Sequence, residues 1–145
     1  MEEFREVLQD LIWETGLSVN QIAAASGVSS AVYSYYLHGR TPTLPVALKI
    51  ACYFGCSLDY LCGLDDRKSA RPYHTDHYDL NKFLTNYRQL LAAHHLTHYQ
   101  FAKTTPAFNE SIIRHWQAGK TPRLDMLYAI AKNLHGSIDE LVGRE

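Results

Sequence analysis

The chain contains one sequence pattern twice. Residues 4–63 align with residues 83–143 at an offset of 79 residues, which becomes 80 after one inserted residue. A pattern that recurs in this way marks a duplicated structural unit, and units of about 60 residues are large enough to fold independently. The repeat therefore predicts two small domains, at residues 1–64 and 80–145. Residues 65–79 are charged, contain a proline and lack apolar periodicity, so they are predicted to be a linker.

Each copy is predicted to be all-α, with five short helices. Apolar residues recur at helical spacing, and no segment alternates apolar and polar residues as a half-buried strand would. Residues that cap helix N-termini stand where the helices are expected to begin: Ser18, Ser29 and Ser57 in the first copy, and Thr97, Asn109 and Ser137 in the second. The third helices are expected to stop at Gly39 and Gly119, and the fourth near Gly55 and Gly136.

The formal net charge of −1 conceals a difference between the copies. Residues 1–68 hold five Lys and Arg against eight Asp and Glu, whereas residues 69–145 hold nine against seven. Tight and unspecific binding of nucleic-acid phosphates requires a strong basic patch. The near-neutral balance argues against that kind of binding.

Other function classes find little support in the sequence. No apolar run approaches the roughly 20 residues that span a bilayer, so no membrane partner is expected. There is no Gly-rich phosphate loop, no paired carboxylates in a plausible pocket and no nucleophile motif, which indicates that the chain is not an enzyme and needs no cofactor. No separate domain for a small molecule is evident.

The cysteines and histidines do not form a metal-binding pattern. Cys52, Cys56 and Cys62 lack CxxC spacing, and their odd number indicates reduced thiols and a cytoplasmic protein. His94 and His98 are four residues apart, but a predicted helix break lies between them. We therefore expect no metal site.

Residues 17–42, L-S-V-N-Q-I-A-A-A-S-G-V-S-S-A-V-Y-S-Y-Y-L-H-G-R-T-P, resemble the Cro and lambda-repressor type of helix-turn-helix regulator. Residues 96–122 are similar, but they lack the turn glycine and carry one extra residue. The resemblance implies two tandem five-helix lambda-repressor-like domains. It also implies that the third helix of each domain enters the major groove of double-stranded DNA.

The resemblance further implies which residues face DNA. Val28, Tyr33 and Tyr36 would point inward in the first copy, and Phe108, Ile113 and Trp116 in the second. The residues left to face DNA are Ser29, Ser30, Ala31, Ser34 and Tyr35 in the first copy, and Asn109, Glu110, Ser111, Arg114 and His115 in the second. Arg40 and Lys120 stand where the family contacts backbone phosphate, and His98 stands near the place where many relatives carry a phosphate-binding glutamine.

The chemistry of these side chains suits base reading. Arg114 can bind guanine O6 and N7 bidentately, and Asn109 can bind adenine or a phosphate. Glu110 can accept a hydrogen bond from cytosine N4. Because the two outward faces differ, the two halves of a DNA target are expected to differ as well.

Two functions follow from these observations. The first is a sequence-specific DNA-binding transcriptional regulator that acts as a repressor. The second is a protein-interaction module, an antirepressor or adaptor, in which one or both DNA-reading faces are lost. The acidic first copy, with Tyr35 on a serine-rich face, favours the second reading. A homodimer or another protein partner stays open in both.

Overall fold

The computed structural model describes residues 1–66, 77–106, 108–109 and 111–144, and most of the expected linker lies outside these ranges. Within them the regular structure consists of helices without strands, which confirms the all-α prediction. The chain divides into two compact units, Met1–Asp76 and His77–Glu145. No helix among the described residues has both the length and the apolarity that a bilayer crossing requires.

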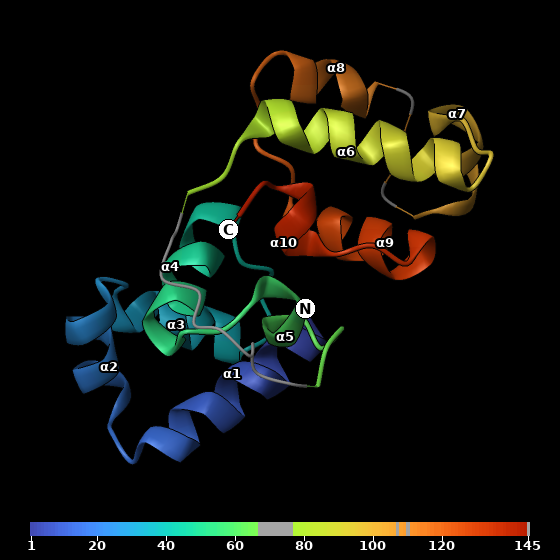
Figure 1. Ribbon diagram of the computed structural model, residues 1–145. Helices are drawn as coiled ribbons and strands as arrows, with labels where there is room; N and C mark the ends of the chain where they lie inside the picture. The colour runs from blue at the N-terminus through green and yellow to red at the C-terminus, as the bar shows by residue number, and fades with distance from the viewer. Residues whose placement is uncertain (67–76, 107, 110, 145) are drawn as a thin grey trace. The chain divides into compact units, whose positions relative to one another are not determined.

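The first unit contains helices of 14, 8, 8, 11 and 4 residues: α1 (Glu2–Thr15), α2 (Val19–Ser26), α3 (Ser30–Leu37), α4 (Leu44–Phe54) and α5 (Leu58–Leu61). Helix α1 packs against α3 and α5, while α2 packs against α3 and α4 (Figure 1). The buried face of α1 carries Phe4, Leu8 and Leu11. Phe4 meets Tyr36 of α3 edge to face, with ring centroids 5.8 Å apart, so the core joins the first and third helices directly.

The second unit repeats this order with helices of 14, 7, 6, 11 and 4 residues: α6 (Leu80–Ala93), α7 (His98–Thr104), α8 (Ile112–Gln117), α9 (Leu124–Leu134) and α10 (Ile138–Leu141). Helix α6 contacts each of the other four. Its core is aromatic: Trp116 lies 5.0 Å from Phe83 and 5.7 Å from Tyr87, measured between ring centroids. The third helix of this unit is thus anchored to the first by an indole ring.

Most predicted helix starts are confirmed. The Ser18 hydroxyl accepts from the Gln21 N–H while the Gln21 amide accepts from the Ser18 N–H, and Thr97 and Gln100 make the same pair of bonds. Ser29, Ser57 and Ser137 also accept from the backbone three residues ahead. These caps depend on residues three positions apart, which is why the sequence reveals them.

The helix ends differ between the units. Gly16 and Gly55 end α1 and α4 in the left-handed region, at φ of +68° and +66°. Their counterparts in the second unit are histidines: His95 at φ +56° and His135 at φ +53°. The helix end that was expected near Gly136 therefore falls on His135. Gly136 instead lies close to Leu90, since a Cβ at this glycine would be 2.8 Å from Cδ1 of Leu90.

Candidate nucleic-acid interface

Helices α2 and α3 are joined by a short turn that fixes their mutual angle. Gly27 adopts φ +74°, which only glycine reaches without strain, and its N–H donates to the Ala23 carbonyl at 3.1 Å. Across the turn, the Ser26 hydroxyl lies 2.7 Å from the Tyr33 hydroxyl. Val28 is buried behind the turn. The backbone bond ends α2 at the turn, and one side-chain bond and a buried valine hold α2 against α3.

Helix α3 has one buried and one exposed face. Tyr33 and Tyr36 are buried, and burial raises the pKa of both hydroxyls, so both stay neutral at physiological pH. The five residues expected to face DNA in this unit are all exposed: Ser29, Ser30, Ala31, Ser34 and Tyr35. The tyrosine face fixes the helix, and a row of short polar side chains with one aromatic ring is left to solvent.

Arg40 lies directly beside this exposed face. The N–H of Arg40 donates to the Tyr35 carbonyl at 3.1 Å, and that of Gly39, at φ +95°, donates to Tyr36 at 3.0 Å, so the chain closes α3 with a Schellman motif. This turn places the Arg40 guanidinium 4.6 Å from the centre of the exposed Tyr35 ring. A cation held over an aromatic ring keeps its charge and loses little freedom when it binds a phosphate.

The same turn recurs after α8. The N–H of Lys120 donates to the His115 carbonyl and that of Gly119 donates to Trp116, both at 3.0 Å. Gly119 adopts φ +93°. Lys120 thus occupies in the second unit the place that Arg40 occupies in the first.

The start of α8 differs from the prediction. The helix begins at Ile112 with Ser111 as its N-cap, and no side chain caps it. Asn109 accepts from the Ser111 hydroxyl at 2.7 Å, so the expected Asn109 cap is wrong. The inserted residue and the absence of a turn glycine lengthen the loop and shorten the helix, which moves Asn109 too far from the first turn. Glu110 lies outside the described residues.

The other second-unit residues keep their expected sides in part. Phe108 and Trp116 are buried, while Ile113 is only half-buried. Those expected to face DNA and described by the structure are exposed: Asn109, Ser111, Arg114 and His115. The outward face of α8 thus carries two basic side chains, where α3 carries serines.

His98 is held inside the second unit. Its Nδ1 lies 2.8 Å from the Tyr87 hydroxyl, and its Nε2 lies 3.0 Å from the Asn109 carbonyl oxygen. Both ring nitrogens therefore have partners within the protein, and neither is left to donate to a phosphate. The residue expected to contact DNA instead connects α6, α7 and the segment before α8.

Sequence reasoning missed two features near these helices. Tyr99 on α7 is exposed, and the Lys103 ammonium lies 4.4 Å from its ring centre. In the first unit, Nδ1 of His38 lies 2.7 Å from the Ser34 carbonyl oxygen. Both pairs are four residues apart on a helix, a spacing that could have revealed them.

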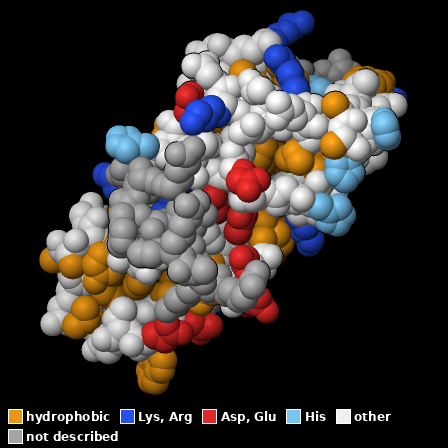
Figure 2. All heavy atoms as spheres, viewed as in Figure 1, with side chains coloured by type: hydrophobic (Ala, Val, Ile, Leu, Met, Phe, Trp, Pro, Cys, Tyr) orange, Lys and Arg blue, Asp and Glu red, His pale blue; other side chains and the backbone are white. Residues whose placement is uncertain are grey.

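Basic side chains do not merge into a single patch on the face seen in Figure 2, where Lys and Arg are scattered among neutral atoms. The described residues include no group of three or more His, Cys, Asp or Glu placed to hold a metal ion.

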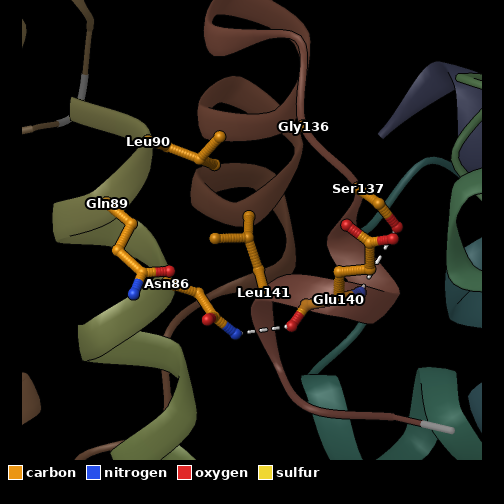
Figure 3. A pocket seen from close by; sticks show the side chains of 7 residues that line it. All are labelled: Asn86, Gln89, Leu90, Gly136, Ser137, Glu140 and Leu141. Atoms are coloured by element: carbon orange, nitrogen blue, oxygen red, sulfur yellow. Dashed lines mark hydrogen bonds between the residues drawn. The ribbon is translucent and has the colours of Figure 1, made fainter. Parts of the chain in front are cut away.

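A pocket between α6 and α10 is lined by seven residues: Asn86, Gln89, Leu90, Gly136, Ser137, Glu140 and Leu141 (Figure 3). The Asn86 amide crosses it to donate to the Glu140 carbonyl at 2.8 Å, and Glu140 supplies its one carboxylate. Paired carboxylates for acid–base chemistry are therefore not present in this pocket.

Comparison with known families finds that residues 10–61 match a family model described as helix-turn-helix. The match begins within α1, covers α2, α3 and α4 and ends at the last residue of α5, and it does not extend into the second unit. Neither the curated proteins nor the solved structures gave a match. The matched family is a DNA-binding regulatory family and not a family of enzymes.

Proposed function

We propose that this protein, with a helix-turn-helix over residues 10–61, is a sequence-specific DNA-binding transcriptional regulator that acts as a repressor. The observation that carries the proposal is the geometry of α3 and its closing turn. A buried tyrosine face fixes the helix, an exposed face offers hydroxyl groups, and Arg40 stands beside it over the Tyr35 ring. Base edges are read from such a face, and phosphates are bound by the turn that follows.

In the first unit, serines are the base-reading groups. The Ser29 hydroxyl accepts from the Val32 N–H at 3.3 Å, so its proton is still available to donate. Ser30 and Ser34 lie one turn apart on the same exposed side. Serine hydroxyls donate and accept, so they contribute contacts of low selectivity, and Arg40 contributes charge.

The second unit is proposed as a second, divergent DNA-reading domain. Its support is the matching order of its helices and the matching turn that presents Lys120. Arg114 is its most selective group, because a bidentate contact to guanine discriminates by about 1 to 3 kcal/mol. Asn109, Ser111 and His115 would lie beside it, and Glu110 would accept from cytosine. The chain then acts as a covalent pseudo-dimer on an asymmetric operator.

Selection of bound duplexes from a random pool tests this proposal. We expect two unlike half-sites separated by about 34 to 36 Å, one helical turn of DNA. With about three to five phosphates neutralised, the logarithm of the binding constant should fall with the logarithm of salt at a slope of about −3 to −5. Recovery of perfect palindromes alone would contradict the asymmetric operator. Failure to retain any pooled duplex at low salt would contradict DNA binding itself.

Arg114→Ala and Lys120→Ala separate the contributions of base and phosphate in the second unit. Arg114→Ala should relax selectivity at one base pair, whereas Lys120→Ala should weaken all duplexes alike and reduce the salt slope by about 1. If neither changes binding while first-unit variants do, the second unit does not read DNA.

A second candidate function is a protein-interaction module on the same fold, an antirepressor or adaptor. Five of the acidic residues of the first unit lie on α1, and this charge disfavours contact with phosphate over that helix. A module that has lost both DNA-reading faces would retain no duplex in the mobility-shift titration at low salt, whereas the proposed regulator would.

A further inference from the structure

The outer face of α1 carries a stripe of acidic side chains. Phe4, Leu8 and Leu11 bury the opposite face. The stripe repeats every fourth residue and is exposed throughout: Glu2, Glu6, Asp10 and Glu14. Like charges four residues apart destabilise a helix, and an acid in the last turn opposes the helix dipole. The last turn of α1 contains no basic residue to offset this.

Two large apolar side chains stand beside the stripe. Trp13 is 86% exposed and Leu17 is 43% exposed. Trp13 lies in the last turn of α1, and Leu17 follows Gly16, which ends the helix, so both are near the C-terminal end of α1. Figure 2 shows acidic side chains next to exposed hydrophobic ones on the first unit. Tryptophan is rarely so exposed in a folded protein, and it is enriched among the residues that dominate binding between proteins.

The second unit shows that the fold requires neither the acidic stripe nor Trp13. The helix α6 corresponds to α1, and its matching positions are also exposed. They carry neutral side chains in place of the stripe and of Trp13: Asn81, Thr85, Gln89, Ala93 and Ala92. The same helix in the same fold is therefore built without an acidic or aromatic side chain at these positions.

We propose that this face of α1 is a docking surface for another protein, and that its partner is a basic amphipathic helix. Trp13 and Leu17 would cover the apolar side of that helix. Lysines or arginines at its margins would pair with Asp10, Glu6 and Glu14. DNA is excluded as the occupant, because the stripe repels phosphate. The surface goes beyond the proposed function, since α3 and not α1 presents the DNA-reading face of the unit.

The test uses the full chain and a synthetic peptide of leucine and lysine patterned as an amphipathic helix. Titration should shift the emission of the exposed Trp13 to the blue and protect it from a soluble quencher, while the buried Trp116 stays constant. A peptide with glutamate in place of each lysine is the counter-probe. Equal binding of both peptides, or no shift with either, would overturn the proposal.

Variants that install the second unit's residues sharpen the test. Two variants are compared: the triple variant Glu6→Thr, Asp10→Gln and Glu14→Ala, and the single variant Trp13→Ala. Each should lower the affinity for the lysine peptide, measured by calorimetry, by about tenfold or more. Glu140→Gln, an exposed acid on α10, is the control and should leave affinity unchanged. Circular dichroism verifies that every variant is folded. Undiminished binding of the lysine peptide by either α1 variant would overturn the proposal. Burial of Trp13 that increases with protein concentration in the absence of peptide would also overturn it, because a second copy of the chain would then be the occupant.

Discussion

The Tyr87 hydroxyl lies 2.8 Å from Nδ1 of His98, whose Nε2 lies 3.0 Å from the Asn109 carbonyl oxygen. A carbonyl oxygen can only accept, so Nε2 carries a proton, and in the neutral imidazole Nδ1 accepts from the Tyr87 hydroxyl. One imidazole thereby fastens the loop before α8 to the first helix of its unit. The corresponding position in the first unit is Val19, and there the Ser26 and Tyr33 hydroxyls make the side-chain bond across the turn.

His98→Ala should lower the stability of the second unit by about 1 to 3 kcal/mol, because it leaves the buried Tyr87 hydroxyl without its partner. Tyr87→Phe alone should cost about 1 kcal/mol. The double variant should lose less than the two single losses combined, with a coupling of about 0.5 kcal/mol or more. Denaturation followed by the buried Trp116 measures all three. Strictly additive losses would mean that the two side chains do not interact.

His95→Gly should stabilise the second unit by about 0.5 to 1 kcal/mol. His95 is held at φ +56°, a region that side chains with a Cβ enter at a cost and glycine enters freely. The reverse change, Gly16→His at the matching position of the first unit, should destabilise by a similar amount. A Cβ at Gly16 meets no atom within 4 Å, so that loss would come from the backbone alone. Thermal unfolding measures both changes. Shifts of the unfolding temperature in opposite directions for His95→Gly and Gly16→His support a backbone origin, and shifts in the same direction refute it.

Arg40→Ala should weaken binding to the selected duplex and reduce the salt slope by about 1. Tyr35→Ala should weaken binding less, because Arg40 keeps its charge but loses the ring that positions it. Tyr35→Phe should bind like the parent, since the contact uses the ring face. Lys49→Ala, an exposed cation on α4, controls for the loss of charge alone. An unchanged slope in Arg40→Ala would remove this residue from the phosphate contacts.

Stability should fall in alkaline solution. Burial raises the pKa of Tyr33 and Tyr87, whereas an unfolded tyrosine ionises near about pH 10. Below that pH the tyrosines are protonated in both the folded and the unfolded state, and their contribution to stability is complete. Above it the unfolded chain releases protons that the folded chain retains, so unfolding is favoured. Urea titrations across this range measure the effect. Tyr33→Phe should flatten the decline for the first unit, and an equally steep decline in that variant would assign it to other groups.

Local signals in the sequence were sufficient for much of the fold. Caps such as Ser18 with Gln21 need only residues three positions apart, and the buried sides of α3 follow from helical periodicity. The prediction that Asn109 caps the third helix of the second unit was wrong, because the inserted residue changed the loop before that helix. Loop geometry has no periodic signal in the sequence. Tyr35 over Arg40 was missed because it depends on the turn at Gly39.

The sequence by itself determined that this protein is all-α and that one helix pattern occurs twice, because caps, glycines and apolar spacing are properties of short segments. The resemblance carried by residues 17–42 also named the exposed side of α3. Only the tertiary structure decided where His98 points, because its partners Tyr87 and Asn109 lie on other segments. The same holds for Gly136 against Leu90. Contacts between distant segments depend on how the helices pack, and no pattern within one helix records that.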